Sequence, residues 1–204
     1  MKDILKEFNK NGINYCIIRN YDFLYDMKSI PSEIDITICK RDIGRAVNIL
    51  KMFGYKKRHW NFSEKHIMLE KDNFVFDIQI DGIYWNDMPY LDSSVYWFKE
   101  EKDCFYVLCD EYKLVMYICH SILGKRNLKY EKEIKLLLNK RLEWSLIDLY
   151  LHKTFGKKYS DEIISSIRNN NFRYKVKYSI RFIMNHPFKF IKNSVRWVVW
   201  RLTL

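Results

Sequence analysis

Long apolar segments are missing from this chain of 204 residues. No uncharged apolar run approaches the roughly 18 residues that a membrane-spanning helix needs. The stretch from Met1 to Lys10 is charged throughout and no apolar region follows it, so we expect no secretory leader. Internal repeats and low-complexity tracts are also lacking, and 48% hydrophobic with 30% charged residues is ordinary for a globular domain. We therefore expect a cytoplasmic protein of globular type.

Cysteine patterns that hold zinc are absent as well. The cysteines occur without a CxxC pair and without a histidine at ligand spacing, which argues against a structural zinc site. We expect all of them to be reduced and buried, as in a cytosolic protein: Cys16, Cys39, Cys104, Cys109 and Cys119.

Acidic residues are missing from the end of the chain. Residues 172–204 contain eight Lys or Arg and no Asp or Glu, so this segment carries most of the net charge of +11. Such a charge can indicate a nucleic-acid surface. Here the basic character belongs to a tail and not to the whole chain.

Hydrophobic periodicity predicts an α+β domain. We expect strands over 13–19, 33–39, 66–70 and 74–81, with a loop over 20–32 and a hairpin turn at 71–73. We expect a first helix around Ile4, Leu5 and Phe8 that Asn11-Gly12 ends, and further helices over 42–53, 115–122, 131–139, 142–155 and 160–168. Asp42 is expected to be an N-cap and Gly54 a helix stop, whereas 82–109 resists assignment. The predicted organisation is a small mixed-sheet core over 1–109, a helical subdomain over 110–171 and a basic amphipathic tail over 172–204.

Acidic side chains interrupt two of the predicted strands. Side chains alternate between the faces of a strand, so Glu33 and Asp35 share one face while isoleucines occupy the other. The same rule places Asp77 opposite Phe76 and Ile78. If the two strands are neighbours, three carboxylates converge.

Three clustered carboxylates repel one another unless a positive group lies among them. Mg²⁺ or Mn²⁺ prefers such oxygen ligands, and the chemistry that uses this arrangement is nucleotidyl or phosphoryl transfer. We therefore predict Glu33, Asp35 and Asp77 as catalytic and metal-binding residues. The alternative is that these acids only decorate the solvent face of an antiparallel sheet.

The segment Pro31-Ser32-Glu33-Ile34-Asp35-Ile36 resembles the Ser-Asp-x-Asp motif of the DNA polymerase beta-like nucleotidyltransferase superfamily. In this resemblance Asp77 corresponds to the third metal-binding acid. More narrowly, the chain resembles bacterial nucleotidyltransferase-like proteins associated with surface-polysaccharide genes, which carry segments like the one around His120 and like Leu142-Glu143-Trp144. The resemblance covers roughly residues 10–170 and implies a nucleotidyltransferase fold, a divalent cation and a nucleoside triphosphate.

Two departures from the superfamily pattern concern this site. Arg19-Asn20 stands where the superfamily has a glycine-containing pair, and Glu33 replaces the usual first Asp. Arg19 either binds phosphate bidentately or pairs with the acids and neutralises them without a metal. We also predict phosphate or nucleotide contacts from Asn20, Ser32, Lys125 and His120, although a lone histidine is commonly structural and a basic loop commonly only solvated.

Aromatic residues are abundant, at 17% of the chain. The segment 84–90, which contains two Tyr and one Trp, would line an acceptor pocket if its rings face a ligand. Core packing is the default interpretation for such residues.

The tail has the pattern of a membrane-surface helix. Apolar residues from Phe188 onward fall on one helical stripe, Pro187 suits a first helical turn, and basic and Trp residues flank the stripe. We predict membrane contacts from Lys189, Lys192, Arg196, Trp197 and Trp200. RNA binding and packing of a terminal helix on the core are the alternatives.

Together these features predict a metal-dependent transferase at the cytoplasmic membrane face that acts on a sugar, a glycan precursor or a lipid-linked acceptor. The alternatives are a non-catalytic membrane-associated binding module of the same fold and an RNA-binding or RNA-modifying protein.

Overall fold

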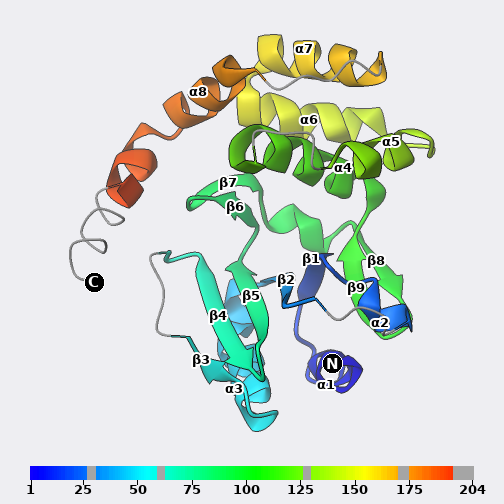
Figure 1. Ribbon diagram of the computed structural model, residues 1–204, viewed down its shortest axis with the longest axis vertical. Helices are drawn as coiled ribbons and strands as arrows, with labels where there is room; N and C mark the ends of the chain where they lie inside the picture. The colour runs from blue at the N-terminus through cyan, green and yellow to red at the C-terminus, as the bar shows by residue number, and fades with distance from the viewer. Residues whose placement is uncertain (27–30, 59–62, 126–129, 170–174, 195–204) are drawn as a thin grey trace. The chain divides into compact units, whose positions relative to one another are not determined.

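The computed structural model describes residues 1–26, 31–58, 63–125, 130–169 and 175–194. The chain divides into two compact units. The first comprises Met1–Asp87 and Asp92–Cys109, and the second comprises Met88–Leu91 and Asp110–Leu204. Strands and helices mix in the first unit, and helices dominate the second (Figure 1). The predicted α+β class is confirmed.

A seven-stranded mixed sheet forms the first unit, in the order β3-β4-β5-β2-β1-β9-β8. Its strands are β1 (Tyr15–Arg19), β2 (Glu33–Ile38), β3 (Lys56–Lys57), β4 (His66–Lys71), β5 (Phe74–Ile80), β8 (Lys99–Lys102) and β9 (Phe105–Leu108). The pairs β2/β5 and β1/β9 are parallel, whereas β1/β2, β3/β4, β4/β5 and β8/β9 are antiparallel. The four predicted strands are all present.

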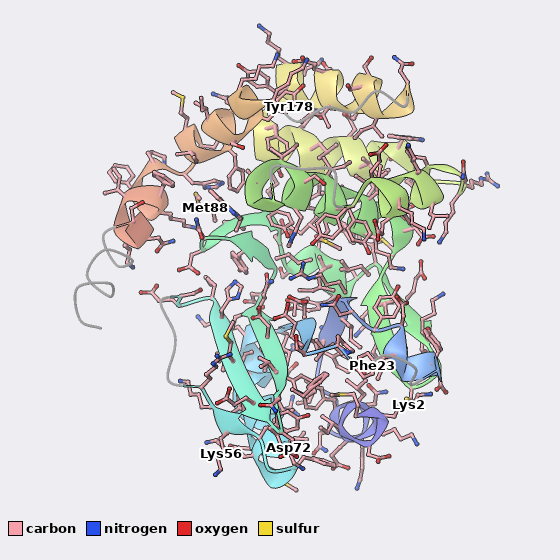
Figure 2. The ribbon with its side chains drawn as sticks, in the orientation of Figure 1. Lys2, Phe23, Lys56, Asp72, Met88 and Tyr178 are labelled. Carbon is pink, nitrogen blue, oxygen red and sulfur yellow. The ribbon has the colours of Figure 1, made fainter. Side chains whose placement is uncertain are left out.

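Two helices cover the isoleucine face of this sheet. Helix α1 (Lys2–Lys10) buries Leu5 and Phe8, and α3 (Ile43–Met52) buries Ala46 and Leu50. These residues form one hydrophobic cluster with Ile34, Ile36 and Ile38 of β2, and side chains fill the space between the layers (Figure 2). Burial of this apolar face leaves the acidic face of β2 on the opposite side of the sheet.

Two turns occur where the sequence predicts them. Gly12 takes a positive φ of 60° where α1 ends, and Asp72 and Asn73 take φ values of 50° and 65° between β4 and β5. Two consecutive positive φ values are the signature of a tight hairpin turn. The predicted helix end and hairpin are confirmed.

Two predictions for the backbone of the first unit need correction. The predicted loop 20–32 contains a short helix, α2 (Phe23–Asp26), because Phe23 and Leu24 are buried in the core. Asp42 occupies the N-cap position of α3, after the 3₁₀ helix η1 (Lys40–Asp42), but its side chain does not cap the helix. It accepts a hydrogen bond from the Asn14 backbone N–H at 2.9 Å and pairs with Arg45.

The cysteines are free, as expected, but not all of them are buried. Cys16 and Cys119 lie in the interior, whereas Cys39, Cys104 and Cys109 are partly exposed. Burial raises the pKa of the Cys119 thiol. The expectation of five buried cysteines therefore holds for two.

The unassigned segment 82–109 supplies five elements. They are β6 (Ile83–Trp85), β7 (Met88–Leu91), the 3₁₀ helix η2 (Ser93–Tyr96), and strands β8 and β9. Of these, β9 pairs with β1 and extends the main sheet.

Helices make up most of the second unit, which also contains strand β7. They are α4 (Asp110–Cys119), the π-helix η3 (His120–Lys125), α5 (Glu131–Leu138), α6 (Trp144–Phe155), α7 (Lys157–Arg168) and α8 (Val176–Met184). The four helices expected over 115–168 are present, although α7 begins three residues before the predicted start. Residues 187–194 are also helical, so the helix expected to begin at Pro187 is confirmed over its described part.

Helix α8 belongs to the packed part of this unit. Tyr178 and Phe182 are buried, and the Ser179 hydroxyl donates to the Ile122 carbonyl at 3.0 Å. In the part of the chain that the structure describes, no helix is both long enough and apolar enough to span a bilayer.

Candidate functional site

Two predicted acids lie side by side on neighbouring strands. The parallel pairing of β2 with β5 sets Asp35 directly opposite Asp77, and Glu33 lies two residues earlier on β2, opposite Val75. Strand alternation puts the three carboxylates on the sheet face that α1 and α3 leave uncovered. Asp35 is buried, whereas the Asp77 and Glu33 side chains are 14% and 43% exposed.

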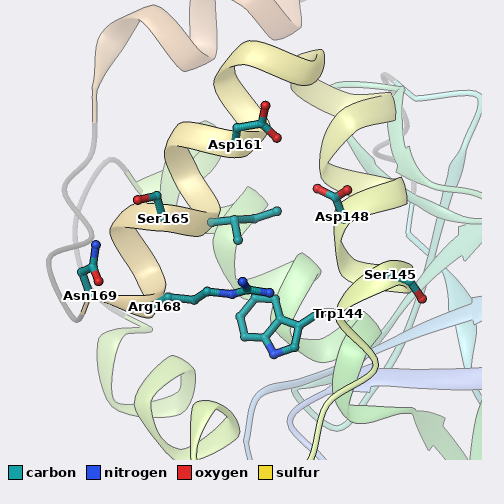
Figure 3. A pocket seen from close by; sticks show the side chains of 8 residues that line it. Trp144, Ser145, Asp148, Asp161, Ser165, Arg168 and Asn169 are labelled. Carbon is teal, nitrogen blue, oxygen red and sulfur yellow. The ribbon is translucent and has the colours of Figure 1, made fainter.

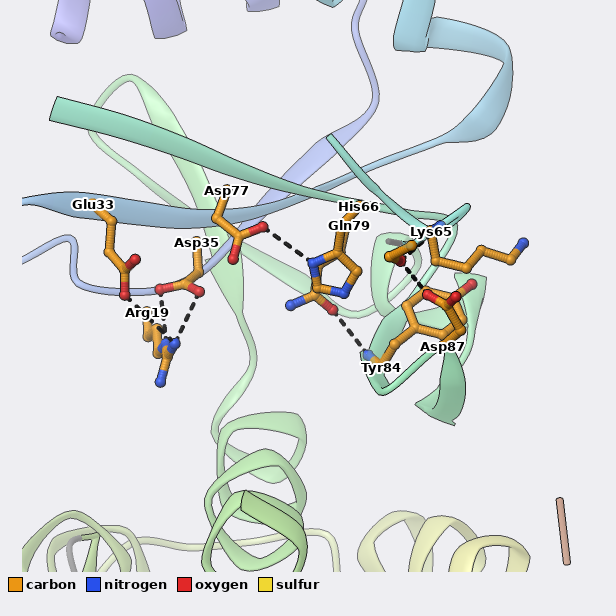
Figure 4. Close-up of polar contacts among 10 residues, drawn as sticks. Arg19, Glu33, Asp35, Lys65, His66, Asp77, Gln79, Tyr84 and Asp87 are labelled. Atoms are coloured by element: carbon orange, nitrogen blue, oxygen red, sulfur yellow. Dashed lines mark hydrogen bonds and ion pairs between the residues drawn. The ribbon is translucent and has the colours of Figure 1, made fainter. Parts of the chain in front are cut away.

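Arg19 holds Asp35 from the β1 side of β2. Its Nε donates to Asp35 Oδ2 at 2.7 Å and its Nη2 donates to Oδ1 at 3.0 Å, while Nη2 also lies 3.9 Å from Glu33 Oε1 (Figure 4). Burial raises the pKa of Asp35 to about 6, and the hydrogen bonds and charge of Arg19 oppose that rise. The Asp35 carboxylate is therefore mainly ionised at neutral pH and forms an ion pair with the Arg19 guanidinium.

Asn20 completes the contacts of Asp35. Its Nδ2 donates to Asp35 Oδ2 at 3.0 Å, and its backbone has a φ of 61°. Asn tolerates this left-handed conformation better than most residues. Asn20 therefore gives the strand end the backbone shape that a glycine would give, and adds a side-chain donor aimed at the acid cluster.

Asp77 contacts a partner on the other side of β5 from Asp35. His66 Nδ1 on β4 lies 3.2 Å from Asp77 Oδ1. Because the strand order is β4-β5-β2-β1, His66 draws Asp77 toward one edge of the sheet while Arg19 draws Asp35 toward the other. The two carboxylates share a face but point to different partners.

The donor set matches a divalent cation in chemistry and in charge. All three acids offer hard oxygen ligands, and together with Arg19 they carry a formal charge of about −2, so that mutual repulsion of the carboxylates favours a bound cation. Their spacing is wider than a metal centre needs. Among described residues, Asp148, His152 and Asp161 bring one donor atom each within 4.8 Å of one another, and the three predicted acids do not.

The rest of this polar face is covered by the segment after β5. The Tyr96 hydroxyl lies 2.8 Å from Thr37 Oγ1, and the Tyr84 backbone N–H donates to Gln79 Oε1 at 2.8 Å. Both tyrosines are buried, and burial raises the pKa of Tyr84 to about 12. Tyr84 therefore serves packing, which is the default interpretation for the aromatic segment.

The remaining predicted phosphate ligands occupy other positions. Ser32 precedes β2, and its carbonyl accepts from the Val75 backbone N–H at 2.9 Å. His120 opens the π-helix of the second unit, and its ring lies edge-on to Tyr90 and Tyr130 at centroid distances of 5.8 and 6.0 Å. Lys125 ends the same π-helix. Their roles toward a nucleotide stay predictions.

The predicted membrane residues are only partly described. Lys189 and Lys192 are exposed in the helical stretch 187–194, and Arg196, Trp197 and Trp200 lie outside the described residues. Large apolar side chains nearby are also exposed: Ile180 at 52%, Met184 at 66%, Phe188 at 86% and Ile191 at 59%.

Two contacts of the site are not indicated by the sequence. His66 opens a predicted strand, but nothing local shows that its ring meets Asp77 eleven residues later. The sequence suggests a phosphate contact for Asn20, whereas the structure places its amide on Asp35. Period-two alternation gives His66 and Met68 a shared face, and Met68 pairs with Asp77 in the antiparallel register.

No family model and no curated protein matches the chain. Among solved structures, the chain is similar to the solution structure of the antibiotic-resistance factor ANT(2'')-Ia, with 13% identity, a TM-score of 0.44, and coverage of 81% of this chain and 88% of that one. It is also similar to the crystal structure of ANT(2'')-Ia in complex with adenylyl-2''-tobramycin, with 12% identity, a TM-score of 0.44, and coverage of 81% and 93%. At these values neither likeness assigns the chain to a family.

Proposed function

We propose that this chain is a metal-dependent nucleotidyl- or phosphoryl-group transferase with its centre at Asp35 and Asp77. The observation that supports the proposal most directly is the register of β2 and β5, which sets these two carboxylates side by side on the sheet face opposite α1 and α3. Glu33 adds a third, more exposed carboxylate on the same face.

Asp35, Asp77 and Glu33 would hold Mg²⁺ or Mn²⁺. The bound cation would neutralise the triphosphate and lower the pKa of the attacking hydroxyl. Because Arg19 and Asn20 occupy three of the positions around the Asp35 oxygens, Arg19 would have to release Asp35 when the site loads. Its guanidinium would then be available for phosphate, to which it donates in the same bidentate manner.

His66 would act as a positioning residue. Its ring contacts Asp77 through Nδ1, and fixing the direction of a ligand carboxylate is the usual role of such a neighbour. The acceptor in this proposal is a sugar, a glycan precursor or a lipid-linked molecule, as the resemblance to polysaccharide-associated proteins implies.

Location at a membrane is a separate part of the proposal. The exposed apolar residues Phe188 and Ile191 alternate with exposed Lys189 and Lys192 on one helical stretch. An apolar face beside lysines matches the surface of an anionic bilayer.

One observation favours a second candidate function, a non-catalytic binding module. The Arg19 guanidinium already neutralises buried Asp35 with two well-formed hydrogen bonds. A site in this state would need no cation, and Arg19 would be a permanent structural partner of Asp35.

Binding of Mn²⁺ and of Mg²⁺ with each nucleoside triphosphate to the full chain, measured by calorimetry, separates the two functions. The transferase proposal expects cation-dependent nucleotide binding that Asp77→Asn and Asp35→Asn weaken at least about tenfold, because each removes a charged ligand. Asp72→Asn is the matched control, since Asp72 is exposed in the turn between β4 and β5.

Absence of cation-dependent nucleotide binding in the wild-type chain would support the binding module. Unchanged nucleotide affinity in both Asp77→Asn and Asp35→Asn would refute the assignment of these residues.

A further inference from the structure

A second group of metal-binding side chains lies in the helical unit, outside the unit that holds the proposed transferase centre. Asp148 and His152 are four residues apart on α6, and so share one face of that helix. Asp161 belongs to α7, which packs against α6. Two ligands at i and i+4 with a third from a neighbouring helix are a recurring plan for a metal site.

One histidine nitrogen faces both carboxylates. His152 Nε2 lies 3.2 Å from Asp148 Oδ1 and 3.2 Å from Asp161 Oδ1. A ring nitrogen carries at most one hydrogen, which cannot point along both lines, and both separations are long for a charge-assisted hydrogen bond. A hydrogen bond from Nε2 to one aspartate therefore leaves the other carboxylate without a hydrogen from this nitrogen.

A shared cation explains the same distances better. Zinc binds histidine nitrogen and carboxylate oxygen at about 2.0–2.2 Å, so two ligands at a tetrahedral angle lie about 3.3 Å apart. The separations from Nε2 to the two oxygens match that value. The two aspartate oxygens lie within 4.8 Å of each other, so all three donors are close enough to share one ion.

We propose that Asp148, His152 and Asp161 bind one divalent transition-metal ion of the Zn²⁺ class. The imidazole nitrogen favours such an ion over Mg²⁺ or Ca²⁺, which prefer oxygen ligands throughout. The three side chains are 43%, 29% and 56% exposed, so an ion reaches them from solvent.

The site opens on a cavity. Asp148 and Asp161 both line a space of about 510 Å³ between α6 and α7, which Trp144 and Arg168 also line (Figure 3). Three protein ligands leave at least one coordination position for water or for an oxygen of a small molecule in this cavity, as in zinc sites that keep an open position. The bound ion also ties α6 to α7.

Calorimetric titration of the metal-free full chain with Zn²⁺ tests the proposal. We expect one equivalent to bind at this site, with the melting temperature of the chain raised when Zn²⁺ is present. His152→Asn and Asp161→Asn, on different helices, should each weaken Zn²⁺ binding at least about 100-fold, because loss of even an outer partner costs 10–100-fold. Mg²⁺ in excess should not displace the ion.

Two control variants separate this site from its neighbours. Glu162→Gln removes an adjacent carboxylate of α7 that pairs with Lys175 and Lys177, and Asp35→Asn disables the centre proposed in the first unit. Both should retain Zn²⁺ binding and the rise in melting temperature. Absence of saturable Zn²⁺ binding in the wild type, or unchanged Zn²⁺ affinity in His152→Asn, would overturn the proposal.

Discussion

Arg19 clamps Asp35 across the antiparallel β1/β2 pair, with Nε and Nη2 donating to the two carboxylate oxygens at 2.7 and 3.0 Å. The Arg19 side chain is 22% exposed and the Asp35 side chain 2% exposed. The pair is thus an ion pair at the border of the core, and the state of the whole acid cluster depends on it.

Removal of the guanidinium should destabilise the fold. In Arg19→Met, Asp35 is left buried without a cation, and breaking a buried pair from one side costs about 3–5 kcal/mol. Because Arg19 is partly exposed, we expect a loss near the lower end of that range in urea unfolding at pH 7.

The double variant Arg19→Met/Asp35→Asn should recover at least about 1 kcal/mol relative to the sum of the single changes, because it leaves no charge unpaired. Strictly additive losses would contradict a direct interaction.

Titration of Asp35 should appear in the pH dependence of stability. Its pKa rises from 3.8 to about 6 on folding, so the folded chain binds more protons than the unfolded chain between these values. The contribution of Asp35 to the free energy of unfolding therefore falls as pH rises through this window, by at most about 3 kcal/mol. Urea unfolding of wild type and Asp35→Asn at pH 4, 5, 6 and 7 should show the variant gaining stability relative to wild type as the pH rises.

Asp42 supplies a control of opposite sign for that experiment. Burial raises its pKa, but the hydrogen bond from the Asn14 N–H and the contact with Arg45 more than offset this, so the pKa lies below the ordinary value. Its contribution to stability is present above the ordinary carboxyl pKa of about 4 and is lost as pH falls below it. Urea unfolding at pH 3, 4 and 5 should therefore show Asp42→Asn gaining stability relative to wild type as the pH falls, and a difference that does not change with pH would contradict the prediction.

The exposed apolar side chains near the C-terminus should control membrane binding without affecting stability. We expect the full chain to float with vesicles that contain phosphatidylglycerol, and Phe188→Ser/Ile191→Ser to abolish flotation. Both residues are exposed, so the free energy of unfolding should change by no more than about 0.5 kcal/mol.

A matched control and a contrasting variant complete this test. Leu149→Ser replaces a similarly exposed apolar residue on α6 and should float normally, whereas Phe182→Ala, at a buried position on α8, should lose about 3–5 kcal/mol of stability. Tight, salt-dependent RNA binding with no flotation would favour the RNA alternative.

The acidic face could be predicted because it depends on local alternation. Glu33 and Asp35 share a face in any extended strand, whatever surrounds it. The meeting of Asp35 with Asp77 depends on a parallel pairing of β2 with β5, and no short-range pattern specifies such a pairing. The resemblance, not the periodicity, indicates that these strands are neighbours.

Other features could not be predicted from the sequence, for physical reasons. The strand Lys99–Lys102 lies at the edge of the sheet and reads KEEK, so it has no apolar alternation to detect. The group around His152 draws its third ligand from the next helix, and the chain shows only the pair Asp148 and His152. The contact of Arg19 with the acids is one of two alternatives that the sequence allows, because charge balance alone leaves both open.

The parallel pairing of Ile17 with Val107 has a consequence for how the chain folds. Strand β1 is synthesised well before β9, so one of its two neighbours is missing until the chain has passed Leu108. Until then that edge of β1 presents unpaired backbone groups, and closing so long a loop slows folding. During translation the first unit therefore stays incomplete, and open to non-native strand pairing, until nearly all of its sequence has left the ribosome.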